Sequence, residues 1–254
     1  MKILLKIAYL GTNYCGYQVQ SNGVTVQEML NRATREVFGF DCDIVGCSRT
    51  DSGVHARGFC ATVSKKGTQT LETTVPVARI PRALNVHLPA DIAVLEARAV
   101  EDQFHARYSV VSKEYEYLIY NGAERDPFLA ERAWHVPQPI DERALDAMQR
   151  AAAAFVGTHD FAACRATGST ELTDTVRTVF SASVTRKGDL ISFCVRADGF
   201  LYNMVRIMAG TLIAVARGKI PAEEIPARLQ AGKRQGMGTT APPEGLYLDR
   251  VFYE

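Results

Sequence analysis

A stretch of thirteen residues, "GCSRTDSGVHARG" at 46–58, concentrates side chains that could carry out chemistry. It places one carboxylate, Asp51, between Arg49 and His55, and Gly53 allows the backbone to turn tightly beside it. An arginine close to an aspartate favours the charged form and typically lowers the carboxyl pKa by about 1–3 units. The stretch therefore predicts a loop that keeps a lone aspartate ionised, as a nucleophile or a general base requires.

Two other interpretations of this loop stay open from the residues alone. Asp and Gly are common in ordinary turns, and aspartic proteases carry an Asp-Ser/Thr-Gly tripeptide like residues 51–53. Aspartic proteases, however, need two carboxyl groups that share a proton, so one of them stays neutral. Arg49 works against a neutral Asp51, which makes an aspartic hydrolase, indifferent to RNA, the weaker alternative.

A second arginine, Arg206, is a candidate partner for a buried carboxylate. Burial raises a carboxyl pKa by up to about 3–5 units, and a nearby guanidinium group offsets that rise. Arg206 lies near the start of an apolar helical stretch, "FLYNMVRIMAG", with no charged residue beside it. Arginines so placed more often extend along the surface and keep the guanidinium group in water, so the residues alone leave both roles open.

The segments around the aspartate predict a sheet that holds its loop. "DIVGC" and "FCATVS" are typical of short strands and flank the loop, so Asp51 is expected on a connector between paired strands. A strand is predicted at residues 2–9, and Thr25 with Glu28 forms the capping-box pattern of a helix start. A further strand is predicted at about 92–99. Together these elements would make the first half of the fold.

The second half shows a similar order of elements. The strand "SKEYEYLIY" at 112–120 has alternate residues on one face: Lys113, Tyr115, Tyr117 and Ile119. Alternating tyrosines in a strand commonly fill a sheet face, which is the role expected for Tyr117. The later elements predicted are a helix opened by Asp141 and closed by Gly157, a hairpin turning at 187–189, a helix at about 201–216 and a final strand.

These elements predict an α+β chain of two similar-sized halves, residues 1–107 and residues 108–254. Both halves mix hairpins with helices, and no flexible linker separates them near residue 107. We therefore expect one continuous, mixed but largely antiparallel sheet, with a cleft between the halves.

The composition limits the classes of partner. The chain has 254 residues, and its net charge of +1 (29 Lys and Arg, 28 Asp and Glu) does not by itself indicate a polyanionic binding partner. A nucleic-acid surface would have to come from local clustering of cations. The six cysteines show no Cys-x-x-Cys pair or metal-ligand spacing, and no apolar run near the start is long enough for a signal peptide or a membrane span. We expect a soluble, cytoplasmic, metal-free protein with reduced cysteines.

Seven segments, taken in order, resemble one known family. "GCSRTDSGVHA" resembles the signature loop of the TruA-type tRNA pseudouridine synthases, whose pattern is close to G-x-x-R-T-D-x-G-V-H. The other segments similar to that family are "GYQVQSNGVTVQEML", "ALNVHLPADIAV", "FHARYS", "KEYEYLIYN", "FLYNMVRIMAG" and "EGLYL". Together they cover nearly the whole chain, so the chain is identified by resemblance as a member of this family.

The resemblance implies that uridine is converted to pseudouridine at tRNA nucleotides 38–40, on the 3′ side of the anticodon stem-loop, without a cofactor or a metal. It implies that Asp51 is the essential catalytic aspartate, that Tyr115 stacks on the target base and helps to remove the C5 proton, and that Arg206 pairs with the aspartate. Arg49 matches the arginine thought to fill the space left by the flipped base. Family members are homodimers of two RNP-like α/β domains, so the resemblance also implies a homodimer with a central, positively lined RNA-binding cleft.

Further RNA contacts, to phosphate or ribose, are expected from His55, His105 and Arg107. A loop histidine is as often a structural hydrogen-bonding group, so both roles stay open for the two histidines. The chain departs from the family in its first loop, where Leu10 replaces an aspartate and Tyr17 replaces a tryptophan. These departures put in doubt how the first loop contacts RNA, and hence which tRNAs are chosen.

A non-catalytic RNA-binding protein that kept the fold is the alternative function. The presence of Asp51, Tyr115 and Arg206 favours the enzyme. The sequence leaves two routes open for Asp51, which either attacks C1′ of the ribose or removes the 2′ proton to give a glycal.

Overall fold

The structure of the protein, a computed structural model, describes residues 1–166 and 174–253. The chain forms two compact units, of which the first contains residues 1–111 together with the chain from residue 247 onward, and the second contains residues 112–246. Each unit has a sheet of mainly antiparallel strands with helices packed on it, so the predicted α+β class is confirmed. The domain boundary at residue 107 stays a prediction.

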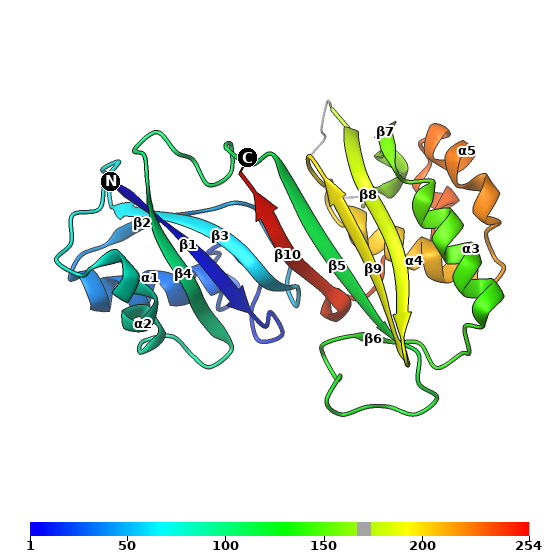
Figure 1. Cartoon of the computed structure of the whole chain (residues 1–254), viewed down its shortest axis with the longest axis horizontal. Helices are drawn as coiled ribbons and strands as arrows, with labels where there is room; N and C mark the ends of the chain where they lie inside the picture. The colour runs from blue at the N-terminus through cyan, green and yellow to red at the C-terminus, as the bar shows by residue number, and fades with distance from the viewer. Residues whose placement is uncertain (167–173, 254) are drawn as a thin grey trace. The chain divides into compact units, whose positions relative to one another are not determined.

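The sheet of the first unit is built around β3 (His55–Lys65). On one side β3 pairs antiparallel with β1 (Lys2–Tyr9), which pairs in turn with β4 (Ile92–Val100). On the other side it pairs antiparallel with β2 (Cys42–Gly46), and the last strand, β10 (Leu246–Phe252), runs parallel to its beginning. The strands predicted at 2–9 and 92–99 are therefore confirmed, and the end of the chain completes the first sheet (Figure 1).

Two helices, α1 (Val26–Phe38) and α2 (Ile80–Asn85), pack against this sheet. The predicted cap is confirmed, because the Thr25 hydroxyl oxygen accepts the backbone N–H of Glu28 at 3.3 Å. The Glu28 carboxylate contacts Arg32 at 2.5 Å, one helical turn further on. The core between helices and sheet contains Ile3, Leu5, Ile7, Val26 and Leu30, each fully buried. Burial of each such side chain stabilises the unit by about 1.5–3 kcal/mol.

The sheet of the second unit begins with β5 (Ser112–Tyr120). It pairs antiparallel with β9 (Leu190–Ala197), which pairs with β8 (Val176–Lys187), which pairs with β7 (Gly157–Asp160). A two-residue strand, β6 (Trp134–His135), lies parallel to the end of β5. The hairpin predicted at 187–189 is confirmed, and Gly188 has the positive φ of 60° that a tight turn between β8 and β9 needs.

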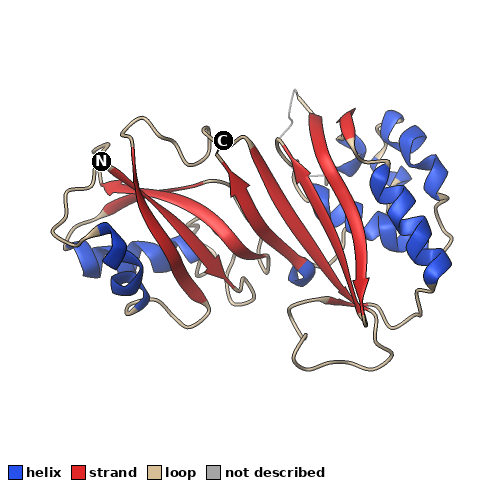
Figure 2. Ribbon diagram, in the orientation of Figure 1, coloured by secondary structure: helices blue, strands red, loops and turns tan. Residues whose placement is uncertain are grey.

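The described residues of the second unit form the helices α3 (Glu142–Ala153), α4 (Met204–Ala216) and α5 (Ile225–Gln230) (Figure 2). Asp141 caps α3 as predicted, since its carboxylate accepts the Ala144 N–H at 2.8 Å. The helix ends at Ala153 and not at Gly157, because the chain turns there and Gly157 begins β7 with a φ of 117°.

The helix predicted from about residue 201 begins at Met204. Asn203, with a φ of 60°, is left-handed and cannot belong to the helix. Nearly every side chain of α4 is buried, so this helix lies in the core between α3 and the sheet. Short 3₁₀ segments occupy Val77–Arg79, Ala162–Cys164, Ala222–Glu224, Arg234–Gly236 and Pro243–Gly245.

Within the part of the chain that the structure describes, no helix is both long enough and apolar enough to cross a membrane. All six cysteines are free thiols, as predicted, and three of them are buried: Cys47, Cys60 and Cys164.

Candidate active site

Asp51 lies on the connector between β2 and β3, which pair antiparallel, so its predicted placement is confirmed. The Val54 N–H donates to the Asp51 carbonyl oxygen at 3.1 Å and closes a four-residue turn. Gly53 is the third residue of this turn and has a φ of 79°, in the region that side chains other than glycine rarely adopt. The turn leaves Asp51 half-buried at the end of a rigid strand pair.

The first loop, residues 10–25, packs against the turn. The Tyr17 N–H donates to the Thr50 carbonyl oxygen at 3.2 Å, and the Ser52 hydroxyl donates to the Tyr14 carbonyl oxygen at 3.1 Å. Gly16, with a φ of 81°, approaches Thr50 so closely that a Cβ there would lie 2.5 Å from the Thr50 carbonyl oxygen. Asp51 is therefore flanked on both sides by residues that the first loop holds.

Two residues predicted beside Asp51 differ sharply in exposure. Arg49 is exposed, so its guanidinium group can move into the space around the loop. His55 is 0% exposed, and its Nδ1 accepts the Gly11 N–H at 2.8 Å. Because a fully buried ring presents no surface to an RNA backbone, the structure favours the structural role over RNA contact for His55.

The other predicted histidine, His105, is half-buried after β4. Its Nδ1 faces the backbone N–H groups of Arg107 and Tyr108, at 3.1 and 3.2 Å. Burial lowers the His105 pKa, and the positive charges of Lys2 and Arg107 lower it further, so the neutral ring is favoured. His105 is thus a hydrogen-bonding group that shapes its loop.

Arg107 is exposed, as an RNA contact requires, and its guanidinium carbon lies 5.9 Å from the centre of the Tyr108 ring. Tyr108 is 78% exposed, and sequence reasoning missed it. An aromatic ring next to an arginine in "FHARYS" was the available signal, because bases stack on such rings.

Tyr115 lies in the second unit, on β5, opposite Val195 of β9. It is 6% exposed, and its ring meets the Phe200 ring edge to face, with centroids 5.0 Å apart and planes at 81°. Sequence reasoning missed Phe200, which restricts the orientation of the Tyr115 ring.

Tyr117, two residues along the same face, is fully buried. Its hydroxyl group donates to the Pro242 carbonyl oxygen at 2.7 Å. Burial and the negative charge of Glu244 raise its pKa, while Arg206 acts in the opposite direction. The predicted packing role of Tyr117 is confirmed.

Arg206 is half-buried in the first turn of α4. Its Nε donates to the Ala241 carbonyl oxygen at 2.8 Å, and its Nη1 donates to Oδ1 of Asn203 at 2.6 Å. These two bonds fix the guanidinium plane, so Arg206 is not a side chain extended along the surface. The left-handed Asn203 places its amide where Arg206 can reach it.

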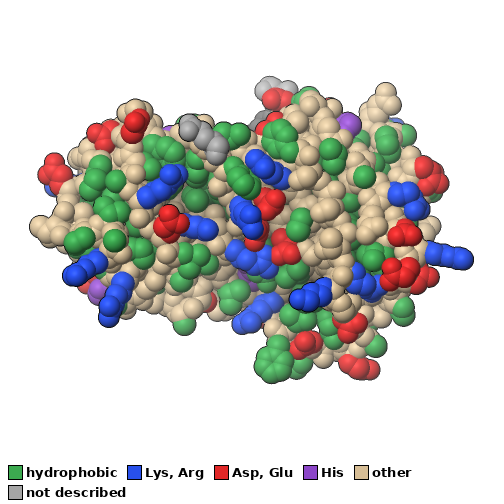
Figure 3. Space-filling model, in the orientation of Figure 1, with side chains coloured by type: hydrophobic (Ala, Val, Ile, Leu, Met, Phe, Trp, Pro, Cys, Tyr) green, Lys and Arg blue, Asp and Glu red, His purple; other side chains and the backbone are tan. Residues whose placement is uncertain are grey.

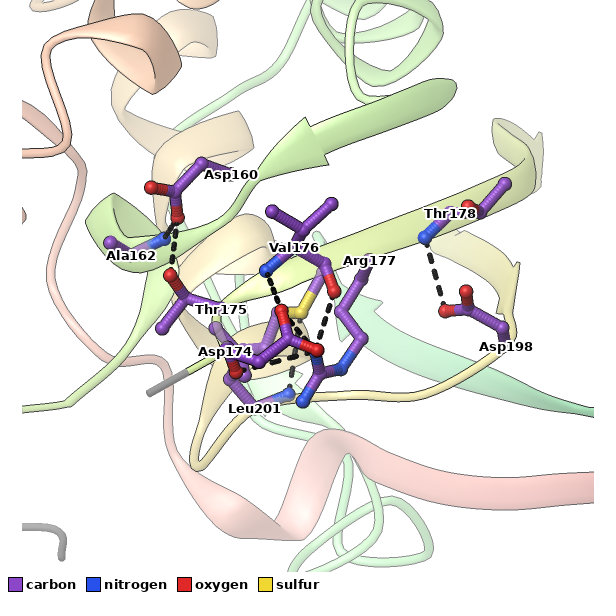
Figure 4. A network of polar contacts seen from close by, with 10 residues as sticks. Asp160, Ala162, Asp174, Thr175, Val176, Arg177, Thr178, Asp198 and Leu201 are labelled. Carbon is purple, nitrogen blue, oxygen red and sulfur yellow. Dashed lines mark hydrogen bonds and ion pairs between the residues drawn. The ribbon is translucent and has the colours of Figure 1, made fainter. Parts of the chain in front are cut away.

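Two polar contacts hold the segment that carries Phe200 and Asn203, and Figure 4 shows Asp198 and Leu201, the residues of the segment that make them. Asp198, at the beginning of this segment, accepts the Thr178 N–H at 3.0 Å and so fixes it to β8. The Leu201 N–H points at the sulfur of Met204, 3.5 Å away, where α4 begins. The groups next to Tyr115 and Arg206 are therefore ordered by bonds within the second unit.

Tyr17, one of the departures from the family pattern, is 3% exposed and packs on Phe59 with ring centroids 4.2 Å apart. Its hydroxyl oxygen is buried and has no hydrogen-bond partner among the described residues. Burial raises its pKa, with a smaller contribution from Cys47. Tyr17 is thus a packing residue beneath the Asp51 loop.

We expect Tyr17→Phe to stabilise the protein by about 1–3 kcal/mol, because it removes a buried hydroxyl group that has no partner. The increase would be measured as a higher free energy of unfolding in urea. Tyr9→Phe is the matched control and should be destabilising, since the Tyr9 hydroxyl is 2.8 Å from the Thr50 hydroxyl. A lower stability for Tyr17→Phe would contradict the prediction.

A pocket of about 280 Å³ in the first unit is lined by residues that the sequence analysis did not single out. Lys6, Arg98 and Arg250 line it together with one carboxylate, Glu96. Lys6 and Arg98 act to lower the pKa of the lining thiol of Cys60, although its burial prevails and raises the pKa. On the face drawn in Figure 3, Lys and Arg side chains lie among Asp and Glu side chains.

Among residues 1–166 and 174–253, no three His, Cys, Asp or Glu side chains gather where they could hold a metal ion.

The candidate site residues are divided between the two units. The first unit contains Arg49, Asp51, His55, His105 and Arg107, and the second contains Tyr115 and Arg206.

The chain is similar to a defined class of RNA-modifying enzymes. A family model described as tRNA pseudouridine synthase matches residues 6–109 and 151–254. The chain is 43% identical over 251 residues to "tRNA pseudouridine synthase A" of Thermoanaerobacter sp. (strain X514), with 99% of each chain covered. Proteins of the same name from Acetivibrio thermocellus and Moorella thermoacetica are 45% and 46% identical, with 99% and 98% of each chain covered.

The chain therefore belongs to the tRNA pseudouridine synthase family. It is an isomerase that acts on uridine in tRNA, and the family predicted from its seven sequence segments is confirmed.

Proposed function

We propose that this enzyme converts uridine to pseudouridine at nucleotides 38, 39 and 40 of tRNA, with Asp51 as the catalytic group. The observation that carries the proposal is the Asp51 turn, which hydrogen bonds from the first loop hold on both sides in a member of this family. A carboxylate so fixed can approach one atom of a substrate reproducibly, as nucleophilic or general-base catalysis requires.

The target base must leave its stem before Asp51 can reach the ribose, which costs a few kcal/mol. Stacking on an aromatic ring returns about 1–3 kcal/mol per base. Tyr115 is the proposed stacking partner, and its orientation is restricted by Phe200. Arg49, which is exposed on the same connector as Asp51, is proposed to fill the space that the base leaves.

Two routes follow from a carboxylate at the ribose. In the first, an Asp51 oxygen bonds to C1′ while the C1′–N1 bond breaks, and C5 of the rotated base later displaces the carboxylate. In the second, Asp51 removes the 2′ proton and the base departs to leave a glycal; C5 of the rotated base then bonds to C1′ while the proton returns to C2′. Both routes end when the C5 proton is lost, which we propose Tyr115 assists, and N1 gains a proton.

Arg206 is proposed to pair with the Asp51 carboxylate and keep it ionised. The support is that bonds to Ala241 and Asn203 fix the guanidinium plane. A fixed guanidinium group suits a carboxylate because it loses little freedom when the two pair.

The finer organisation follows the family. We propose two RNP-like halves whose sheets form one continuous surface with a central RNA-binding cleft, a homodimer, and activity in the cytoplasm without a cofactor or a metal. Arg107 and His105 are proposed RNA contacts. Arg107 would act through its charge, and His105 through hydrogen bonds, because its lowered pKa favours the neutral ring.

The choice of nucleotides can be tested with anticodon-stem variants of one tRNA. Each transcript would carry a single uridine in this region, at position 38, 39 or 40, with paired bases adjusted to keep the stem. We expect pseudouridine at each of the three positions and none at a uridine placed on the 5′ side of the stem. Modification of the 5′ side alone would contradict the proposal.

We expect Tyr115→Phe to bind tRNA like the parent and to turn over more slowly, by about 10²-fold or more, because stacking remains and a proton-transfer group is lost. Tritium release from tRNA labelled at uridine C5 measures turnover, and filter binding measures affinity. Tyr117→Phe is the matched control, since that hydroxyl is bonded to Pro242. Parent-like turnover in Tyr115→Phe would remove the hydroxyl group from the mechanism.

A further inference from the structure

His55 lies where the first loop meets the turn that carries Asp51. It is the first residue of β3, is 0% exposed, and accepts the Gly11 N–H on Nδ1 at 2.8 Å. Because Nδ1 is the acceptor, the hydrogen bond assigns the ring proton to Nε2 and requires a neutral imidazole. The ring is therefore a fixed acceptor for the backbone of the first loop.

Gly11 transmits this contact to the catalytic turn. A Cβ at Gly11 would lie 2.0 Å from the Val54 carbonyl oxygen, so the two backbones touch and only glycine fits. Val54 in turn closes the Asp51 turn with its N–H, at 3.1 Å from the Asp51 carbonyl oxygen. A continuous path of contacts thus runs from His55 through Gly11 and Val54 to Asp51.

The last strand also holds the His55 ring. Its register partner on β10, Tyr247, packs against it with ring centroids 4.7 Å apart. The Arg57 guanidinium carbon lies 4.2 Å from the centre of the Tyr247 ring, and Arg57 pairs with Asp249 at 3.1 Å. The imidazole is locked between the first loop and the last strand, as a group that fixes another side chain must be.

We propose that His55 is the positioning residue for Asp51, acting through Gly11 and Val54 without touching the substrate. The hydrogen bond to the His55 Nδ1 holds the first loop against the Asp51 turn. That turn then sets the direction of the Asp51 carboxylate. A misplacement of about 1 Å at a reacting group costs about 10²-fold in rate. Phosphate contacts dominate RNA affinity, so affinity for tRNA should change little.

The test compares two substitutions of similar size. His55→Leu removes the acceptor, whereas His55→Asn can keep it, because Oδ1 of asparagine stands at the same distance from the backbone as Nδ1 of histidine. We expect kcat to fall by about 10²-fold in His55→Leu, with KM for tRNA unchanged within about threefold. His55→Asn should have a kcat at least about tenfold higher than that of His55→Leu, because it keeps the acceptor and so avoids part of the misplacement. A thermal melt of each variant checks that both remain folded.

A second pair of variants tests the path without changing the ring. Gly11→Ala places a methyl group against the Val54 carbonyl oxygen and should lower kcat as His55→Leu does. Gly236→Ala is its control, because a Cβ there meets nothing within 4 Å and its φ is not positive. Parent-like kcat is expected for Gly236→Ala.

Three results would overturn the inference: parent-like kcat in His55→Leu, an equal loss in His55→Leu and His55→Asn, or a change in KM alone. The inference rests on the catalytic role proposed for Asp51, so Asp51→Asn is assayed beside these variants. An active Asp51→Asn protein would overturn that role and this inference together. An inactive Asp51→Asn protein beside a fully active His55→Leu protein would overturn this inference alone.

Discussion

Asp51→Asn is expected to lower pseudouridine formation by about 10²–10⁴-fold or more, because it removes the only group proposed to act as nucleophile or base at the ribose. Asparagine has nearly the same shape, so the turn closed by Val54 and Gly53 should persist. Binding of tRNA should stay close to that of the parent. Release of tritium from tRNA labelled at uridine C5 would measure the rate, and filter binding the affinity.

The matched control is Asp43→Asn, on β2 of the same unit. Asp43 is exposed, and its carboxylate accepts the Gly67 N–H at 2.9 Å, a contact that an asparagine oxygen can keep. We expect parent-like rates for this control. If Asp51→Asn releases label as fast as the parent, the proposed mechanism is wrong.

Arg206→Ala should have the next largest effect, a loss of about 10²-fold in kcat, with a much smaller change in tRNA affinity. Burial drives an unpaired carboxylate towards its neutral form, and a neutral carboxyl group is neither a nucleophile nor a base. Arg206→Lys keeps the charge but loses the planar fork that Ala241 and Asn203 orient, so it should recover only part of the rate.

Arg217, just after the end of the same helix, supplies the control. It is exposed and donates to Gln138 at 2.7 Å, so Arg217→Ala should leave the rate within about twofold of the parent, as surface substitutions usually do. A loss of tRNA affinity without a change in kcat for Arg206→Ala would assign Arg206 to the RNA surface instead. Single-turnover rates at saturating enzyme would separate the two outcomes.

The local elements were predictable because their signals are short in range. Thr25 and Asp141 cap helices where the sequence indicates, and the glycine at 188 turns the hairpin between β8 and β9. The boundary errors have local causes as well. A left-handed Asn203 delays the start of α4, and a bend before Gly157 ends α3 early.

The contacts that order the site were not predictable, because they join residues far apart in the chain. Nothing in the sequence near His55 indicates that its hydrogen-bond partner is Gly11 or that Tyr247 packs against its ring. The same holds for Phe200 beside Tyr115. The sequence left RNA contact and structural hydrogen bonding both open for His55. Burial favours the structural role, because a ring with no exposed surface must satisfy its hydrogen bonds within the protein.

The parallel pairing of β10 with β3 has a consequence for biogenesis. Domains tend to fold in order as they emerge from the ribosome, at roughly 5–20 residues per second. Here the strand that braces His55 through Tyr247 is translated after the whole of the second unit. A nascent chain that ends before β10 would therefore lack this brace, which would delay catalytic competence until the second unit and β10 have both been made.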